Sequence, residues 1–342
     1  MSTRGVISPS PEEGDRQFES ALRPVTLADF TGQPKVKEIL AIAIQAARAR
    51  GEAMDHVLFH GPPGLGKTTL ASIVAQELGA PFDQTSGPVL QKKLDLTGIL
   101  SNIRERQVFF IDEVHRLMMD VEEMLYSALE DYRVDIVIGA GPGARTHSLP
   151  IPRFTCIAAT TRQGLVSAPM RGRFGLVLRL NHYDVDDMIK IVTRSAALLE
   201  VKIDAEGAKE IGRRARGTPR IANRLLRRVR DYAQVRASGF VDIGVAKQAL
   251  DLLEVDRYGL DEADRKLMLA ILQNYGGGPV GLNTLAAAID EQAETIEEVY
   301  EPYLIQLGFL DRTPRGRIAT ERAWDYFQVK RRGPTPQPGL FD

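Results

Sequence analysis

The sequence predicts an α/β fold with a mostly parallel sheet, a separate helical lid domain and a C-terminal winged-helix domain. Three observations lead to this prediction. Apolar runs of strand length alternate with helical patterns in the first half of the chain, which is typical of a parallel sheet. A glycine-rich loop follows the first of these runs. After residue 180 the strand character fades, and the chain ends with three helical patterns and a short hairpin.

The glycine-rich loop has the sequence of a phosphate-binding site. Its letters, GPPGLGKTT at residues 61–69, fit the pattern G-x-x-x-x-G-K-[ST] without a mismatch. In such a loop backbone N–H groups surround the phosphates, Lys67 reaches the β- and γ-oxygens, and the Thr68 hydroxyl is a ligand for Mg²⁺. Apolar residues at helical spacing follow until Gly79, so a helix N-terminus faces the anion. The sequence therefore predicts a nucleoside triphosphate site.

A second apolar run supplies carboxylates to this site. Residues 107–113 are long enough for a central parallel strand, whose C-terminal end faces the ligand in open α/β sheets. The run ends in Asp112 and Glu113. The first carboxylate suits a water-mediated contact to Mg²⁺, and the second is placed to orient a water that attacks the γ-phosphate. After a matching phosphate loop, this pair predicts ATP hydrolysis.

A third run, residues 154–161, ends in two threonines. Either Thr160 or Thr161 is placed to bond the γ-phosphate or the attacking water. Arg171 and Arg173 follow shortly afterwards. They are candidates for stabilising charge in the transition state, where an arginine is worth a large rate factor. The alternative is that they pair with surface carboxylates.

Residues 133–150 separate the second and third runs. Two alternating arms around a glycine-rich tip predict a β-hairpin from Arg133 to Pro150. Its apolar residues have two explanations that the sequence does not separate. The hairpin packs on its own domain, or it is an exposed contact for a partner protein.

The composition predicts a protein of the cytoplasm. With 44 basic and 45 acidic side chains the net charge is −1, so no global field draws the chain to nucleic acid. The single cysteine, Cys156, cannot form an internal disulfide, in keeping with a reducing compartment. We recognise neither a signal peptide nor an apolar run that would span a bilayer.

The patterns divide the chain into five parts. The ends are rich in Ser, Pro and charge, which predicts disorder. The lid reads as helices at 184–199, 205–214, 219–237 and 242–253. Three helices and a hairpin around residues 314–316 give the third domain the order of a winged helix. The predicted parts are a disordered segment (1–22), a large ATPase domain (23–182), a lid (183–255), a winged-helix domain (256–330) and a disordered tail (331–342).

Several segments together resemble a known family. The chain resembles the AAA+ ATPases in five segments: GPPGLGKTT, DEVHR (112–116), ATTR (159–162), RGRFG (171–175) and GTPR (217–220). The chain more narrowly resembles the RuvB family, bacterial motors that drive branch migration of Holliday junctions. This resemblance extends over residues 23–327. It is carried by TSGPVL (85–90), EDY (130–132), residues 214–230, GPVGL (278–282), EPYLIQ (301–306) and TPRGR (313–317).

The resemblance implies a role for each matching residue. Asp112 holds the water of the metal, Glu113 orients the attacking water, and Thr160 is the first sensor. Arg173 corresponds to the finger that reaches the γ-phosphate of a neighbouring subunit, and Arg220 to the second sensor on the lid. The positions that the resemblance places around ATP and Mg²⁺ are Arg23, Gly61, Gly64, Leu65, Gly66, Lys67, Thr68, Thr69, Glu130, Asp131, Tyr132 and Tyr183.

A finger that acts on a neighbour's nucleotide makes the active site composite. The resemblance therefore implies a homohexameric ring around duplex DNA, in which hydrolysis moves the lid against the sheet. It also implies that RuvA docks on the hairpin from Arg133 to Pro150. A functional link with RuvC at Holliday junctions completes the implied partners.

The winged-helix domain predicts how DNA is held. The last helix of a helix-turn-helix usually enters the major groove, but residues 294–301 carry four glutamates that phosphates repel. We therefore expect this helix not to read bases. Arg312, Arg315 and Arg317 on the wing are expected to contact backbone phosphates, which positions DNA without specifying sequence. The alternative is that they are ordinary solvated charges.

Two other functions compete with a DNA motor. A clamp-loader-like ATPase shares the sheet, the lid and a trans arginine, but is expected to carry a helical collar in place of the winged helix. An ATP-switched DNA-binding regulator needs neither Glu113 nor Arg173. The eight arginines from Arg213 to Arg230 do not by themselves indicate a nucleic-acid patch. Their helix also has an apolar face, so we expect most of them to serve the lid and subunit contacts.

Overall fold

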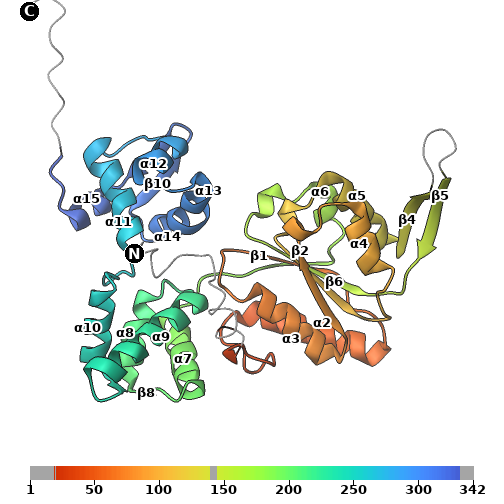
Figure 1. Ribbon diagram of the computed structural model, residues 1–342, viewed down its shortest axis with the longest axis horizontal. Coiled ribbons are helices and arrows are strands. Elements are labelled where there is room, and N and C mark those ends of the chain that lie inside the picture. The colour runs from red at the N-terminus through yellow and green to blue at the C-terminus, as the bar shows by residue number, and fades with distance from the viewer. Residues whose placement is uncertain (1–18, 20, 139–144, 332–342) are drawn as a thin grey trace, which may run out of the picture. The chain divides into compact units, whose positions relative to one another are not determined.

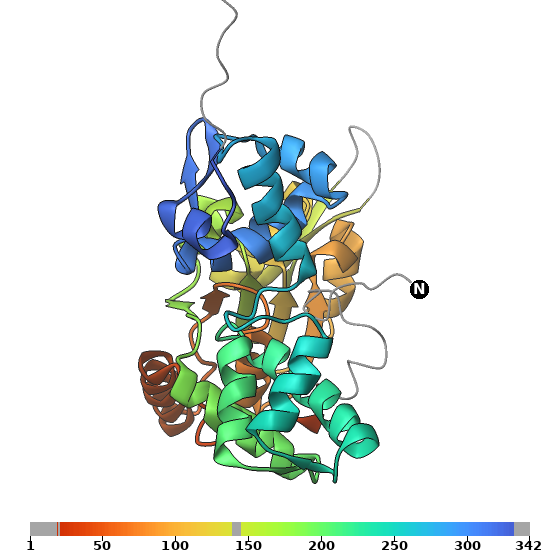
Figure 2. The same ribbon diagram turned by 90° about the vertical axis from the view of Figure 1, so that its left-hand side faces the viewer.

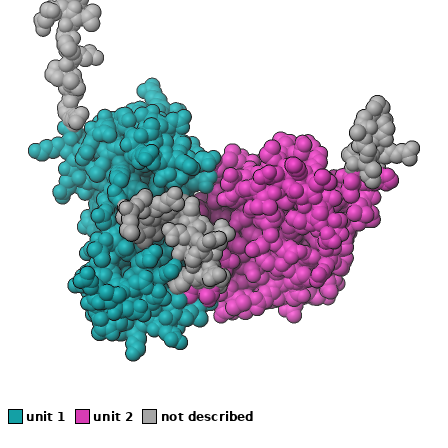
Figure 3. Space-filling view, in the orientation of Figure 1, with its two compact units in different colours: residues 1–12, 188–342 teal, residues 13–187 magenta. Residues whose placement is uncertain are grey.

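The computed structural model describes residues 19, 21–138 and 145–331 (Figure 1). The predicted disordered segments, 1–22 and 331–342, lie almost wholly outside the described residues, and so does the glycine-rich tip of the hairpin. The chain divides after Asp187 into two compact units (Figure 3). Along the described residues, no helix is both long and apolar enough to cross a membrane.

A five-stranded parallel sheet forms the centre of the first unit. Helices α2 (Pro34–Arg50) and α3 (Lys67–Leu78) lie on one face, and α4 (Lys93–Leu100), α5 (Met119–Glu130) and α6 (Ala168–Arg171) on the other (Figure 1). Because both faces are covered, the central strands are almost entirely apolar. The strands stand in the order β2 (Phe82–Ser86), β3 (Val108–Asp112), β6 (Thr155–Thr160), β1 (Val57–His60) and β7 (Leu176–Arg179).

The three strands expected from apolar runs are the three central strands. Their neighbours β2 and β7 were not predicted, because β2 is largely polar and exposed and β7 has only four residues. The main core lies between the sheet and helices α4 and α5. It is filled from α5 by Val121, Leu125 and Ala128, which recur at helical spacing and are fully buried.

The expected hairpin is present beside the main sheet. Strands β4 (Arg133–Ile138) and β5 (Arg145–Pro150) pair antiparallel, with Arg133 opposite Pro150 and Ile138 opposite Arg145. The two arms differ in burial along their length. Val134 at the base is fully buried in the core of the domain, whereas residues 147–150 on the second arm are exposed, and the arms project from the unit (Figure 1).

The second unit contains the lid and the winged-helix domain. The lid helices match the predicted positions closely and pack around buried Leu225, Leu226 and Val229. Two short strands, β8 (Lys202–Ile203) and β9 (Phe240–Val241), were not predicted. Figure 2 shows the lid in green to cyan. Its helices are α7 (Val185–Leu198), which begins just before the division, α8 (Ala205–Arg214), α9 (Pro219–Arg236) and α10 (Ile243–Leu252).

The winged-helix domain has the predicted order of elements. Its core gathers Leu267, Leu285 and Leu304 from three helices and Phe309 from the segment just before the wing. The wing is a short antiparallel hairpin of β10 (Leu310–Thr313) and β11 (Gly316–Ala319). The helical elements are α11 (Glu262–Leu269) with the π-helical turn η5 (Ala270–Asn274), α12 (Leu282–Ile289), α13 (Ala293–Thr295), the π-helical turn η6 (Ile296–Tyr300), α14 (Glu301–Gln306) and α15 (Glu321–Phe327).

Candidate active site

The phosphate loop lies between β1 and α3, at the carboxyl edge of the sheet. Gly61, Gly64 and Gly66 have φ angles of 138°, 78° and 98°, in the region that favours glycine. At Gly61 a Cβ atom would lie 2.3 Å from the carbonyl oxygen of Leu180, so only glycine fits. Lys67 opens α3, and its Nζ donates to the carbonyl oxygens of Gly61 and Pro62 at 2.7 and 2.8 Å. The Lys67 side chain is thus held against the phosphate loop.

The back of the loop is fixed by two aromatic side chains. The Tyr183 hydroxyl donates to the carbonyl oxygen of Leu65 at 3.0 Å. Burial raises the pKa of Tyr183, so the hydroxyl stays protonated and remains a donor. A Cβ atom on Gly66 would lie 3.1 Å from the ring of Phe30. Tyr183 was predicted to lie near the nucleotide, but no sequence pattern pointed to Phe30.

The residues expected to hold Mg²⁺ lie side by side. The Thr68 hydroxyl, in the first turn of α3, donates to Oδ2 of Asp112 at 3.2 Å. Asp112 is the last residue of β3 and is only partly buried. Mg²⁺ prefers oxygen ligands and is usually held by one or two protein groups together with substrate phosphates. One hydroxyl and one carboxylate next to the phosphate loop fit that chemistry.

Glu113 follows the strand in a left-handed turn. Its φ angle is 49°, which is uncommon outside glycine, and it places the carboxylate beyond the end of the sheet. Oε2 of Glu113 forms an ion pair with Nη1 of Arg116 at 3.1 Å, and both side chains are about half exposed. Exposed pairs of this kind are weak. The carboxylate is therefore able to leave Arg116 and orient a water.

The two threonines at the end of β6 have different surroundings. Thr160 is fully buried; its Oγ1 lies 2.9 Å from Nδ1 of His115 and accepts from the backbone N–H of Arg162 at 3.0 Å. Desolvation by burial lowers the pKa of His115, which favours the neutral ring in this hydrogen bond. Thr161 is less buried. Of the alternatives that the sequence left open, Thr161 has the better access to a ligand, and Thr160 serves internal bonds.

The structure separates the two arginines after β6. Arg171 donates to the backbone carbonyl oxygen of Val166 at 2.6 Å, so it holds its own loop together. Arg173 donates to the carbonyl oxygen of Pro169 at 2.8 Å, but it also pairs with Glu130 at 2.9 Å, and its guanidinium carbon lies 4.3 Å from the centroid of the Tyr126 ring. Tyr126 and Glu130 stand one turn apart on α5. Sequence reasoning missed the role of Tyr126, although the spacing of four residues indicates a shared helix face.

The remaining residues expected near ATP fall in three places. Arg23 is exposed. Asp131 pairs with Arg133 at the base of the hairpin, at 3.2 Å, and Tyr132 packs edge-on against the ring of Phe154. Arg220 belongs to the second unit, where it is the second residue of α9. A direct role of these residues at the nucleotide stays a prediction.

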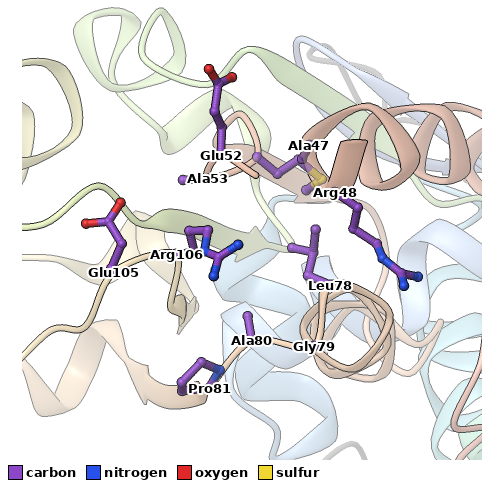
Figure 4. A pocket seen from close by; sticks show the side chains of 11 residues that line it. Ala47, Arg48, Glu52, Ala53, Leu78, Gly79, Ala80, Pro81, Glu105 and Arg106 are labelled. Atoms are coloured by element: carbon purple, nitrogen blue, oxygen red, sulfur yellow. The ribbon is translucent and has the colours of Figure 1, made fainter. Parts of the chain in front are cut away.

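A separate pocket opens at the other edge of the sheet. Its volume is about 210 Å³, and it is lined by the ends of α2 and α3 and by Pro81 and Arg106, which precede β2 and β3 (Figure 4). Because Pro81 and Arg106 precede their strands, the pocket lies at the amino ends of the strands. The phosphate loop follows the carboxyl end of β1 and is therefore at the opposite edge of the sheet. The pocket is not part of the nucleotide site.

Comparison with known families decides the identity of these domains. Residues 22–180 match the P-loop domain of the Holliday junction DNA helicase RuvB, residues 183–256 the RuvB AAA lid domain, and residues 257–328 the RuvB C-terminal winged-helix domain. The chain belongs to the RuvB family. The predicted fold class and the resemblance to this family are confirmed, and with them a P-loop AAA+ ATPase.

Relatives of the RuvB family resemble the chain over its whole length. The Holliday junction branch migration complex subunit RuvB of Solibacter usitatus is 70% identical and covers 100% of both chains. That of Koribacter versatilis is 62% identical over 98% of this chain and 93% of its own. A solved structure, the Thermotoga maritima RuvB Holliday junction branch migration motor, has 48% identity and a TM-score of 0.83, covering 91% of this chain and 99% of the other.

The three wing arginines that were predicted to contact DNA differ in their surroundings in this RuvB-family chain. Arg312 and Arg315 are exposed; Arg312 pairs with Glu297 at 2.8 Å. Arg317 is only 8% exposed, and its Nε donates to Glu301 at 2.5 Å. The prediction that Arg317 contacts DNA directly does not fit this conformation, because its charge is already compensated by a buried glutamate. A glutamate of α14, which looked repulsive in sequence, thus supports the wing.

Proposed function

We propose that this chain hydrolyses ATP as a subunit of a homohexameric ring and uses the cycle to move duplex DNA and to drive branch migration of Holliday junctions. The observation that carries the proposal is the placement of Arg173. Its side chain is 24% exposed, donates to the carbonyl oxygen of Pro169 and pairs with the exposed carboxylate of Glu130, whereas Arg171 donates to two backbone carbonyl oxygens of its own loop. Such an arginine is available to a neighbouring subunit. The family membership points to the same activity.

In this proposal each residue of the site has one task. Lys67 holds the β- and γ-phosphates, while Thr68 and Asp112 hold Mg²⁺, which neutralises charge on the phosphates. Glu113 leaves Arg116 and orients the attacking water. Thr161 bonds the γ-phosphate or that water, and Thr160 with His115 fixes the end of β6.

Residues outside the loop complete the cycle. Arg173 enters the site of the adjacent subunit and stabilises charge in the transition state. Arg220 senses the γ-phosphate from the lid. The exposed arginines Arg312 and Arg315 contact backbone phosphates, so the ring holds DNA of any sequence. Arg317 orients the wing through Glu301.

The proposed partners are RuvA and RuvC. RuvA docks on the projecting arms of the hairpin from Arg133 to Pro150, and RuvC acts on the same junctions. We place this assembly in the cytoplasm. The exposed second arm of the hairpin supports a docking role, because a hairpin that served only its own core would bury both arms.

The test is ATP-dependent dissociation of a synthetic four-way junction. The wild-type chain with RuvA and Mg²⁺ is expected to dissociate the junction, and Glu113→Gln to lose this activity while it still binds ATP. Electron microscopy should show rings on duplex DNA. ATP turnover without junction dissociation, in the presence of RuvA and rings, would favour the clamp-loader-like alternative. DNA binding that depends on ATP without turnover would favour the regulator.

A further inference from the structure

A cluster of buried charges joins the lid to the winged-helix domain. Arg216, in the turn before α9, is 4% exposed, and its two Nη atoms donate to the carboxylate of Asp264. Its Nε donates to the carbonyl oxygen of Gly259 at 2.6 Å. Asp261 lies 3.9 Å from Nη2. Arg216 belongs to the lid, whereas its three partners belong to the winged-helix domain.

The winged-helix side of this joint is rigid. Asp261 and Asp264 cap the start of α11, each accepting the backbone N–H of the other at 3.0 and 2.9 Å. The guanidinium carbon of Arg216 also lies 5.1 Å from the centroid of the Tyr303 ring, which comes from α14. Arg216 therefore contacts two helices of the winged-helix domain at once. It cannot move without moving them or breaking several bonds.

The polypeptide backbones approach closely at the same place. A Cβ atom on Gly259 would lie 2.4 Å from the carbonyl oxygen of Arg214, so no larger side chain fits between lid and winged helix there. Arg214 itself donates to the carbonyl oxygen of Val255 at 2.7 Å. The segment between the domains is thus bonded to the lid on one side and closed by Arg216 on the other.

The electrostatics of the joint make its central pair costly to break. Asp264 is fully buried, and desolvation raises its pKa to about 7, against the attraction of Arg216. A buried charge that loses its partner is strongly destabilising, because neither water nor another charge replaces the contact. Separating Arg216 from Asp264 inside the fold is therefore expected to be costly.

The lid end of the joint is next to the proposed nucleotide sensor. Arg216 and Gly217 have φ angles of 56° and 62°, which makes a tight left-handed turn into α9. Arg220 stands in the first turn of that helix. Only three residues separate the side chain that anchors the winged helix from the side chain proposed to sense the γ-phosphate.

We propose that Arg216 locks the lid and the winged-helix domain into one rigid body, so that lid movement at Arg220 is delivered to the DNA. Arg216 is a positioning residue: it touches neither nucleotide nor DNA. The inference rests on the proposed function, because it takes Arg220 as the nucleotide sensor and the wing as the DNA contact. A loose joint would let the lid move while the wing stays in place.

The test compares two variants of the joint with a matched control. Asp264→Asn removes the charge from the winged-helix side, and Arg216→Lys keeps the charge but loses the two-pronged contact. Glu210→Gln is the control, because it weakens a similar buried pair with Nε and Nη2 of Arg214 inside the lid, whereas the bond of Arg214 Nη1 to Val255 and the contacts of Arg216 do not involve Glu210. Three quantities are measured: ATP hydrolysis without DNA, duplex DNA binding, and junction dissociation per ATP hydrolysed.

Both joint variants are expected to hydrolyse ATP and bind DNA within about twofold of the wild type. Junction dissociation per ATP should fall at least tenfold for Asp264→Asn and less for Arg216→Lys, and stay unchanged for Glu210→Gln. Unchanged coupling in both joint variants overturns the inference. An equal fall of all three quantities, or an equal loss in Glu210→Gln, shows a general structural role and overturns it as well. A wild type that does not dissociate junctions refutes the proposed function instead.

Limited proteolysis reads the joint without relying on activity. Arg257 is exposed in the connecting segment and is a site for trypsin. Cleavage after Arg257, followed by mass spectrometry, should be about tenfold faster in Asp264→Asn than in the wild type, because the segment opens more often. In Glu210→Gln the rate should not change. Equal rates in all three proteins contradict a joint held by Asp264.

Discussion

The ATPase domain and the joint between lid and winged helix both carry arginines paired with acids, but the pairs differ in burial. In the ATPase domain, Arg116 with Glu113 and Arg173 with Glu130 each have at least one partner that is half exposed or more. At the joint, Arg216 and Asp264 are almost completely buried. Exposed pairs exchange partners at little cost, whereas breaking a buried pair leaves an uncompensated charge.

This difference separates groups that act on a ligand from groups that hold domains together. Glu113 and Arg173 must let go of their present partners in order to meet a water or a phosphate. Arg216 has its donors satisfied by the protein. Substitutions in the exposed pairs of the ATPase domain should therefore change catalysis with little effect on stability, and those at the joint should do the opposite.

The largest effect is expected at Arg173. Arg173→Ala should lower ATP hydrolysis by the ring about 10³-fold, the lower end of the range for arginine fingers, with a melting temperature close to the wild type. Because the finger acts on the next subunit, mixed rings with a variant that lacks Lys67 should regain part of the activity. Turnover measured over a series of mixing ratios checks this.

Arg171→Ala is the matched control for this experiment. Arg171 donates to Val166 within its own loop, so its loss should lower the melting temperature and change turnover much less. Mixed rings containing Arg171→Ala should show no complementation. If Arg171→Ala lost turnover like Arg173→Ala and kept its stability, the assignment of the finger would have to be exchanged.

The second effect concerns Thr160, the last residue of β6, and Thr161, which follows it. Thr161→Val should reduce kcat about 100-fold, if its hydroxyl bonds charge that develops on the γ-phosphate. Thr160→Val leaves His115 and the N–H of Arg162 with one partner fewer, so it should cost about 1 to 3 kcal/mol of unfolding free energy and much less in kcat. Steady-state kinetics and urea unfolding separate the two, and the reverse pattern would restore Thr160 as the sensor.

The sequence predicted the nucleotide site at the carboxyl edge of the sheet much better than the joint between lid and winged helix. The loop at residues 61–69, the pair Asp112–Glu113 and the central strands are local patterns, because one short segment supplies the strand, the turn and the side chains. The fate of Arg317 was not local: its partner Glu301 lies 16 residues away on another element. Its burial therefore did not appear in the sequence.

The contact between Arg216 and Asp264 was not predicted for the same reason. Arg216 and Asp264 stand 48 residues apart, and in sequence Arg216 was one arginine among eight that were expected to serve the lid and subunit contacts. Charge runs usually predict solvated faces. Which arginine of such a run is buried depends on the packing of a second domain, and the sequence gives no periodicity for that.

A smaller effect is expected where a neighbour positions the finger. Glu130→Gln removes the charge that holds Arg173 on α5, but an amide still accepts a hydrogen bond. A surface pair is worth about 0.2 to 1 kcal/mol, so kcat should fall no more than about fivefold. The KM for ATP should stay unchanged if Glu130 acts only through Arg173. Glu123→Gln, an exposed glutamate of the same helix, is the control and should leave both constants unchanged.

The smallest effect tests a buried group that avoids charge altogether. His56 Nδ1 accepts the backbone N–H of Cys156 at 2.9 Å, and Nε2 lies 3.0 Å from the carbonyl oxygen of Leu129. This pattern suits a neutral ring, and burial lowers the pKa of His56 below its usual 6.5. In the unfolded chain the ring takes up a proton near pH 6.5, so the contribution to stability is complete above that pH and is lost as the pH falls below it.

The ATPase domain should therefore lose about 1 kcal/mol of unfolding free energy through His56 between pH 7.5 and 5.5. Cys156 is the only cysteine of the chain and is fully buried, so its reaction with a dithiodipyridine reagent in urea reports the opening of this domain at both pH values. His56→Gln should flatten the dependence on pH, whereas His147→Gln, at an exposed position of β5, should leave it unchanged. An equal slope in all three proteins would mean that His56 is protonated as easily inside the fold as in the unfolded chain, and that burial at this site, unlike burial at the joint, does not control charge.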